Sequence, residues 1–211
     1  MYLSRVRLDT AKRRTLLALA APQQLHGAVE NCFDVTGPRK RNLWRVDALH
    51  GGRYLMILSE DRPRLEQLRL QFGFPGEADE IREYEALLAR IKAGSQWQFR
   101  LTANPTRSVI SDGMARGKAV AHVSVHHAME WLQRKAALHG FAIMGEGSCV
   151  TASGWKIFSR GGNRASRVRL KEVTYEGRLR VEAAERFCEA LCRGIGRGKA
   201  YGMGLITVMR A

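Results

Sequence analysis

The feature that most constrains the fold is a glycine-rich segment close to the C-terminus. Residues 193–204 read R-G-I-G-R-G-K-A-Y-G-M-G, with five glycines and three basic residues in twelve positions. Apolar residues recur at helical spacing before this segment, and residues 205–208 have the apolar character of a buried strand. The pattern therefore predicts a helix–loop–strand connection whose glycines permit positive φ and close backbone approach.

Two common nucleotide-binding loops are excluded for this segment. A P-loop needs a glycine where Arg193 stands and a serine or threonine where Ala200 stands. A dinucleotide fingerprint leads from a strand into a helix, which is the reverse order. Two roles stay open: the glycines serve chain geometry alone, or their backbone N–H groups bind an anion. In the second case Arg197 and Lys199 offset the negative end of the preceding helix.

The net charge of +15 is the strongest global signal in this 211-residue chain. Such a charge indicates a polyanionic partner, more often nucleic acid than an anionic membrane. Residues 1–92 carry 16 basic and 12 acidic side chains, whereas residues 93–211 carry 19 and 8. We therefore expect the second half to supply the main binding surface. No segment has the length of a membrane span or an uninterrupted signal core, so we expect a cytoplasmic protein.

The order of the expected elements indicates an α+β protein. In the first half, strands are expected over residues 2–8, 43–49 and 54–58, with helical pieces on both sides of Pro22 and over residues 63–70. Residues 80–92 are ambiguous: their apolar spacing is helical, yet this half lacks a fourth strand. In the second half, strands are expected over residues 97–101, 141–144 and 205–208, with helices from Ser124 and Ala183.

Three connections of the second half complete the prediction. Residues 104–118 are expected as a polar, basic connection, and residues 155–175 as a hairpin-like region. A turn at Glu176 and Gly177 is expected to lead into a strand over residues 179–181. The resulting β-α-β-β-α-β order predicts two tandem ferredoxin-like (RRM-like) domains, over residues 1–92 and 93–211. Sheets of this fold often bind RNA.

The richest basic run lies between positions 156 and 171, where six basic residues occur without an acidic one. Residues 161–163 are expected at the tip between two strands. Alternation along the second strand predicts that its cations share one face. A charged ribbon of this kind can neutralise nucleic-acid phosphates, and we favour this role over that of a solvated edge strand protected by charge. The six residues are Lys156, Arg160, Arg164, Arg167, Arg169 and Lys171.

His26 is the candidate catalytic residue, on a polar helical patch beside Gln23 and Gln24. The residues alone leave structural and catalytic roles open for it. His122 and His126 have helical i,i+4 spacing but lack further ligands, so no residue is assigned to a metal. The four cysteines are scattered and predict no disulfide framework.

Six short segments, in order along the chain, resemble the CasE family of CRISPR RNA-processing endoribonucleases from type I-E systems. They are M-Y-L-S-R-V (1–6), Q-Q-L-H (23–26), F-R-L-T-A-N-P (99–105), E-W-L-Q-R-K (130–135), Y-E-G-R-L (175–179) and G-I-G-R-G-K-A-Y-G-M-G-L (194–205). The resemblance implies two ferredoxin-like domains, a fourth strand at residues 79–84, and an active-site histidine at His26. It also implies a CRISPR repeat RNA substrate and a place in the type I-E surveillance complex.

The chemistry expected from this resemblance needs no cofactor. RNA supplies its own nucleophile, the 2′-hydroxyl, and histidine suits the proton transfers because its reference pKa of about 6.5 lies near working pH. Family members often carry tyrosine at the position of Gln23. The amide of Gln23 can position groups but cannot deliver a proton, so the role expected for Gln23 is auxiliary. The cations of the basic run and the loop residues Gly196, Arg197, Gly198 and Lys199 are expected to bind RNA. The alternative is an RNA-hairpin-binding protein of the same fold that does not cut.

Overall fold

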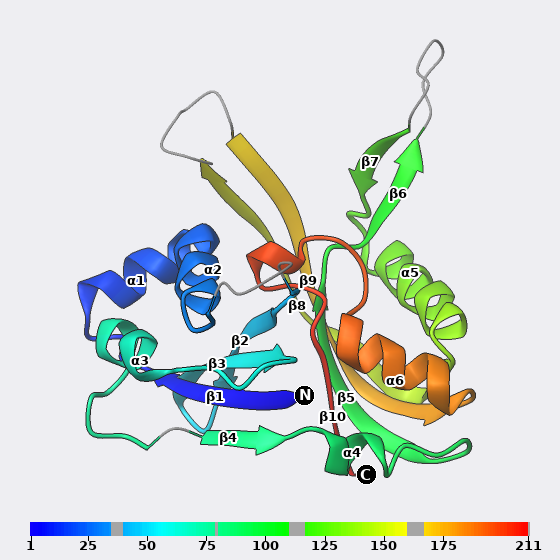
Figure 1. Cartoon of the computed structure of the whole chain (residues 1–211). Coiled ribbons are helices and arrows are strands. Elements are labelled where there is room, and N and C mark those ends of the chain that lie inside the picture. The colour runs from blue at the N-terminus through cyan, green and yellow to red at the C-terminus, as the bar shows by residue number, and fades with distance from the viewer. Residues whose placement is uncertain (35–39, 79, 110–116, 160–166, 211) are drawn as a thin grey trace.

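The computed structural model describes residues 1–34, 40–78, 80–109, 117–159 and 167–210. It contains two four-stranded antiparallel sheets with helices packed against them (Figure 1). The first sheet has the order β2-β3-β1-β4, and its strands are β1 (Tyr2–Leu8), β2 (Leu43–Leu49), β3 (Gly52–Ser59) and β4 (Glu80–Glu83). The second has the order β10-β5-β9-β8, and its strands are β5 (Gln96–Ala103), β8 (Phe141–Ser159), β9 (Arg167–Val181) and β10 (Ile206–Arg210).

The first domain forms around β1, in which Ser4, Val6 and Leu8 alternate with more exposed residues and face the core. Its helices are α1 (Arg13–Ala20), α2 (Pro22–Glu30) and α3 (Glu66–Phe72). Proline occupies the first turn of α2, where its missing N–H costs no helical hydrogen bond. The predicted break at Pro22 is therefore confirmed, and it begins the helix that carries His26.

The ambiguous stretch after residue 79 combines both expected structures. β4 pairs with β1 as the fourth strand, and it is followed directly by the short helix α4 (Glu85–Leu88). Tyr84 and Ile91 are buried on either side of α4. The helical spacing in the sequence therefore reflects α4 and its buried flanks, while the resemblance correctly implied the strand.

The second domain repeats the order with α5 (Val125–Leu138) and α6 (Ala184–Arg193) as its helices. The Ser124 hydroxyl accepts a hydrogen bond from the backbone N–H of His127 at 3.2 Å, which caps the start of α5. Gly140 follows its end with φ of +75°. Both ends of α5 are thus where the sequence predicts them, and the two-domain ferredoxin-like fold is confirmed.

Two expectations for the second domain are wrong. Glu176 and Gly177 do not form a turn, because β9 runs through both and pairs with β5 without interruption. A Cβ on Gly177 would lie 2.1 Å from the Ser148 hydroxyl, where the register of β8 shifts between Met144 and Cys149. The glycine therefore marks a close approach between strands.

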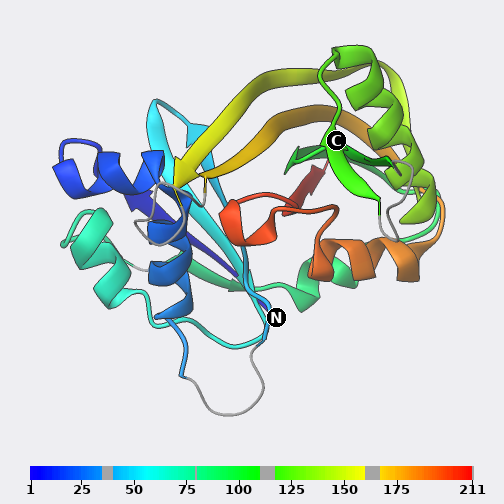
Figure 2. The same cartoon turned by 90° about the horizontal axis from the view of Figure 1, so that it is seen from above.

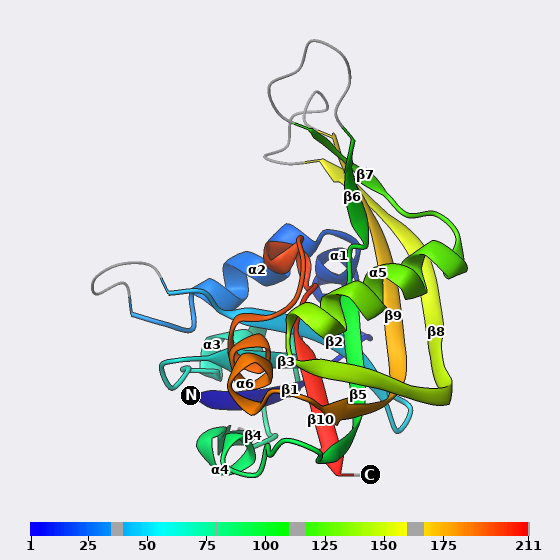
Figure 3. The ribbon, with the colours of Figure 1, turned by 90° about the vertical axis from the view of Figure 1, so that its right-hand side faces the viewer.

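The connection expected over residues 104–118 is also more ordered than predicted. It contains β6 (Thr106–Val109), which pairs in an antiparallel sheet with β7 (Lys118–Ala121). Figures 1 and 3 show that this pair extends in the same direction as the ends of β8 and β9. The second domain therefore presents two neighbouring two-stranded arms.

The two domains share one apolar interface. Leu43, Leu58 and Tyr84 of the first domain belong to the same buried cluster as Leu205 and Ile206 of the second. The division at residues 92 and 93 remains our proposal: the last strand of the first sheet ends at Glu83, and the second sheet begins at Gln96. Within the described ranges, no helix has both the length and the apolar character needed to cross a membrane.

A single buried guanidinium connects the two sheets. Arg45 on β2 is 2% exposed and bonds the Asp47 carboxylate through Nε and Nη2, at 2.7 and 2.8 Å. Its Nη1 donates to the backbone carbonyls of Arg100 and Leu205, and its Nη2 also donates to the Thr207 hydroxyl. All five N–H donors of the side chain are therefore used, three of them across the interface.

We predict that Arg45→Met lowers the free energy of unfolding by about 3 kcal/mol, because the Asp47 carboxylate stays buried without its main partner. Urea unfolding measures this. Arg5→Met is the matched control: Arg5 forms a bidentate pair with Glu80 on the neighbouring strand but is only half-buried, so its loss is expected to cost less than about 1 kcal/mol. Equal losses for the two variants would contradict a special role for Arg45.

Candidate nucleic-acid interface

The glycine-rich loop lies between the two domains. It connects α6 to β10 and contains one turn of 3-10 helix, η1 (Lys199–Tyr201). Its five glycines have φ values from +71° to +90°, which confirms the predicted need for glycine. A Cβ on Gly202 would lie 2.7 Å from the Trp44 ring of the first domain, and one on Gly196 would lie 3.1 Å from the Trp131 ring of α5. Figure 2 shows the loop between the two sets of helices.

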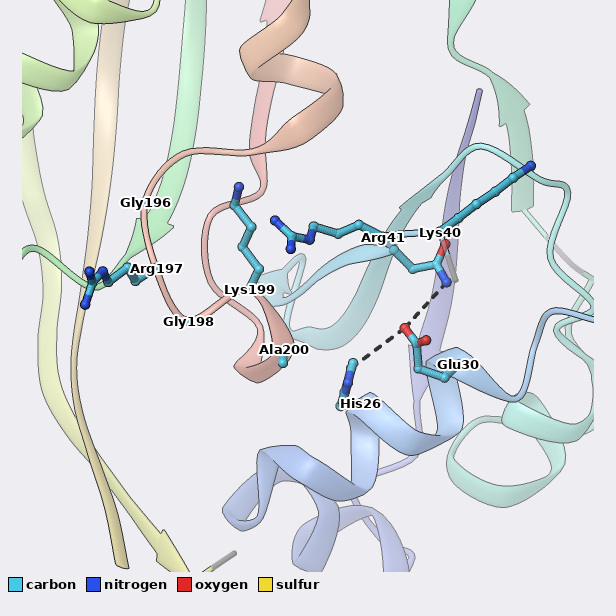
Figure 4. Close-up of a pocket in the computed structure, with 10 residues that line it drawn as sticks. His26, Glu30, Lys40, Arg41, Gly196, Arg197, Gly198, Lys199 and Ala200 are labelled. Atoms are coloured by element: carbon cyan, nitrogen blue, oxygen red, sulfur yellow. Dashed lines mark hydrogen bonds and ion pairs between the residues drawn. The ribbon is translucent and has the colours of Figure 1, made fainter. Parts of the chain in front are cut away.

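A cleft of about 490 Å³ separates this loop from α2. One wall carries His26 and Glu30, and the opposite wall carries the glycine-rich loop with Lys199 (Figure 4). Residues 40–42 close a third side. The fold therefore brings the predicted catalytic histidine and the predicted loop cation into one cavity, although 173 positions separate them in the sequence. We call this cavity the His26 cleft.

His26 faces a carboxylate that sequence reasoning missed. Its Nδ1 lies 3.9 Å from the Glu30 Oε1 one helical turn later, and both side chains are largely buried. Asn42 donates a hydrogen bond to the same carboxylate oxygen at 3.5 Å. Glu30 can stabilise a protonated imidazole and limit its rotation, as a carboxylate does in other histidine-containing sites. The i,i+4 spacing of His26 and Glu30 was the available signal.

Arg41 and Lys199 supply positive charge opposite His26. Figure 4 shows the Arg41 side chain extending toward the Lys199 side chain, whose ammonium lies at the end farther from His26. Burial lowers the pKa of the Lys199 ammonium, and the neighbouring Arg41 guanidinium lowers it further. Two cations held this close repel each other, and an anion between them relieves that repulsion. The arrangement suits a phosphate group in the same cleft as the imidazole. Arg41 had not been predicted as a site residue.

Gln23 is placed differently from a group that acts on substrate. Its Nε2 donates to the backbone carbonyl of Ser159, at the end of β8, over 3.2 Å, and it does not line the His26 cleft. Phe158 packs nearby against Tyr201 of η1, with ring centroids 4.9 Å apart. The end of β8 is therefore held by both α2 and the glycine-rich loop. Gln23 has the geometry of a positioning residue.

The basic ribbon is partly as predicted. Arg169 and Lys171 both lie over the Trp155 ring, at 4.0 and 5.5 Å from its centroid, so they share one face. Lys171 is only 7% exposed, and Lys156 forms an ion pair with Glu172. These two lysines therefore mainly contact protein groups.

The exposed cations of the described ribbon are Arg167 and Arg169. The structure does not describe Arg160 and Arg164, which lie in the range 160–166. Their predicted RNA contacts stay predictions.

Comparison with known proteins identifies relatives along the whole chain. A family described as "CRISPR associated protein" matches residues 1–210. The chain is 28% identical over 217 residues to CRISPR-associated endoribonuclease Cse3 of Thermus thermophilus, covering 99% of each. It is also similar to a solved structure of CRISPR endoribonuclease Cse3 bound to 19 nt RNA, with a TM-score of 0.81, 26% identity and 98% of each chain covered.

A chain of a CRISPR RNA-guided surveillance complex shares the fold, with a TM-score of 0.67 and 20% identity over both full lengths. The resemblance of the six sequence segments to CRISPR-associated endoribonucleases is confirmed by these matches.

We predict that Arg167→Ala with Arg169→Ala flattens the salt dependence of RNA-hairpin binding. Each lost phosphate contact removes roughly 0.7–0.9 from the slope of log affinity against log salt concentration. Binding titrations over a range of salt concentrations measure this slope. The control is Arg5→Ala with Arg7→Ala, which removes two cations at the same strand spacing that are paired with Glu80 and Glu77. An unchanged slope in the ribbon variant would place the RNA elsewhere.

We also predict that Gly196→Val and Gly198→Val each weaken RNA binding. A side chain at these positive φ values costs about 1–2 kcal/mol, and it would press on Trp131 or on the Met203 sulfur. Gly76→Val is the control, because Gly76 has open space around its Cβ position. Thermal unfolding and affinity are measured together. If both loop variants fold and bind RNA like the parent, the glycine-rich loop only connects α6 to β10 and has no role in RNA binding.

Proposed function

Because the chain belongs to the family of CRISPR-associated proteins, whose match spans residues 1–210, we propose that it is an endoribonuclease that matures CRISPR RNA. It binds the repeat hairpin of the precursor RNA and cleaves it without a metal ion. The observation that carries this proposal is the His26 cleft, in which an imidazole shares one cavity with Arg41 and Lys199. The similarity to an endoribonuclease and to an RNA-bound structure supports it.

The proposed reaction transfers a phosphoryl group within the RNA. The 2′-oxygen loses its proton and forms a bond to the adjacent phosphorus, while the bond from phosphorus to the 5′-oxygen breaks. The leaving 5′-oxygen takes up a proton. The products are therefore a 2′,3′-cyclic phosphate and a 5′-hydroxyl, and water is not consumed in this step.

His26 performs one of the two proton transfers, because an imidazole can both accept and donate a proton. Glu30 stabilises the imidazolium form of His26 through the ion pair on α2. Arg41 and Lys199 hold the scissile phosphate and balance the negative charge that grows in the transition state. Alignment of the 2′-oxygen with phosphorus and the 5′-oxygen follows from this fixed phosphate.

Gln23 contributes through the structure rather than through proton transfer. By holding the Ser159 carbonyl, it keeps the end of β8 against α2. The ribbon cations then bind the hairpin at a set distance from His26. We further propose that the protein acts in the cytoplasm as a subunit of a type I-E surveillance complex. The support is the fold that it shares with a chain of a CRISPR RNA-guided surveillance complex.

We predict that His26→Ala slows single-turnover cleavage of a repeat hairpin by roughly 10²–10⁴-fold. Affinity is expected to change little, because one imidazole adds little to a net charge of +15. His126→Ala is the matched control: His126 forms the same i,i+4 pair, with Glu130 at 3.3 Å, but it is exposed on α5. It is expected to leave both rate and affinity unchanged. Cleavage in EDTA is expected to match cleavage without it.

Three outcomes separate the alternatives. Full activity of His26→Ala would overturn the assigned mechanism. Loss of cleavage in EDTA that is restored by a divalent cation would overturn the metal-independent reaction. A parent protein that binds the hairpin but never cuts it, with or without added metal, would favour the non-catalytic RNA-binding alternative. Gln23 supports that alternative, because it occupies the position where the resembling family often has tyrosine and it cannot deliver a proton. Its side chain is also already bonded to the Ser159 carbonyl.

A further inference from the structure

A second, smaller pocket lies on the other side of the glycine-rich loop. Its volume is about 160 Å³, and it is enclosed by β6, β7, α5 and the loop. Gly196 and Arg197 line both this pocket and the His26 cleft, so the two cavities are neighbours across one stretch of backbone. Figure 4 shows the Arg197 side chain turned away from His26. We call this cavity the Asn104 pocket.

The charges around the Asn104 pocket are all positive. Arg107 comes from β6, Lys135 from the last turn of α5, and Arg197 from the loop. Within the described ranges, none of the three forms an ion pair with a carboxylate, and no acidic residue lines the pocket. Elsewhere cations are neutralised locally, as Arg100 is by Glu176. Unpaired cations gathered in a small pocket indicate an external anion.

The floor of the pocket offers an acceptor as well. Asn104 is 6% exposed, and its backbone pairs with Arg197 in an isolated bridge. Its side-chain Oδ1 is buried without a hydrogen-bond partner among the described residues. Buried amide oxygens are normally bonded, so an unpaired one next to three cations points to a ligand that brings a donor. A ribose 2′-hydroxyl is such a donor, and it is joined to phosphates in RNA.

The size of the pocket restricts which part of an RNA it can hold. At about 30 Å³ per water molecule, its volume equals that of roughly five waters. This space suits one sugar–phosphate unit and is far too small for a duplex. Because the pocket adjoins the His26 cleft, the strand that occupies it is continuous with the strand being cut.

We propose that the Asn104 pocket binds one ribose–phosphate unit of single-stranded RNA that flanks the hairpin next to the cleavage site. Arg107, Lys135 and Arg197 contact the phosphate, and the Asn104 amide accepts from the 2′-hydroxyl. The inference rests on the proposed function, because it assumes that the scissile phosphate lies in the His26 cleft. It adds a contact that the hairpin itself does not make, and so extends the recognised RNA beyond the stem.

The test compares two RNAs on a variant with Arg107→Ala and Lys135→Ala. One RNA is the repeat hairpin with single-stranded flanks on both sides, and the other is the same hairpin without flanks. Both carry a 2′-deoxy nucleotide where the parent cuts, so that affinity is measured without cleavage. The variant is expected to bind the flanked RNA roughly tenfold more weakly. The slope of log affinity against log salt concentration is expected to fall by about 0.7, the value for one phosphate contact of a single strand. Its affinity for the trimmed hairpin is expected to be unchanged.

Arg90→Ala with Lys92→Ala is the matched control, because it removes two exposed cations beyond α4, at the end of the molecule opposite β6 and β7 in Figure 1. It is expected to affect both RNAs alike. A separate measurement replaces the RNA flanks with DNA flanks, which lack the 2′-hydroxyl. This replacement is expected to weaken binding by the parent protein but not binding by the Asn104→Ala variant. The Arg107 and Lys135 variant decides the matter if Asn104→Ala does not fold.

The outcomes distinguish this inference from the proposed function. An equal loss for flanked and trimmed RNA, or no loss for either, overturns the Asn104 pocket as a flank site while the parent still binds and cuts the hairpin. A parent that binds neither RNA overturns the proposed function, and with it the inference. A loss confined to the flanked RNA supports both.

Discussion

The relative placement of the two domains depends on the buried guanidinium of Arg45. Its five N–H groups each have an acceptor, and three of those acceptors belong to the second domain. A buried charge tolerates little displacement, because any shift leaves a donor or the Asp47 carboxylate unpaired. The Leu205 carbonyl that it binds comes directly after the glycine-rich loop, and Arg45 itself follows residues 40–42 of the cleft. One side chain therefore holds two walls of the His26 cleft in place.

The glycine-rich loop completes this arrangement because it can be packed from both sides. Trp44 of the first domain and Trp131 of the second stand within about 3 Å of where side chains would begin at Gly202 and Gly196. Only residues without a Cβ permit this spacing at positive φ. The first explanation that the sequence left open, chain geometry, is confirmed by these contacts, and anion binding by the backbone N–H groups stays a prediction. The same geometry places Lys199 in the His26 cleft and turns the Arg197 side chain away from His26.

The strongly positive charge of the chain is divided by structure into two classes. Many cations are neutralised by a neighbouring carboxylate, such as Arg5 by Glu80 and Lys156 by Glu172. Others face cavities or the ribbon surface without such a partner among the described residues, including Arg41, Lys199 and Arg169. Only the second class is available to phosphates. A count of charges predicts a polyanionic partner, but the pairing decides which surface receives it.

The sequence by itself determined the features that depend on neighbouring residues. The alternation in β1, the cap and stop of α5, the start of α2 at Pro22 and the glycine-rich loop are local, because near-neighbour sterics and hydrogen bonds set them. His26 was identified by its resemblance to a family motif, and the i,i+4 position of Glu30 was visible although it was not used. Only the tertiary structure decided the rest. The lengths of β8 and β9, the pairing of β6 with β7, the bonds of Arg45 and the meeting of Arg41 with Lys199 all join residues distant in sequence. No local pattern encodes such contacts, because they exist only once the two domains have packed.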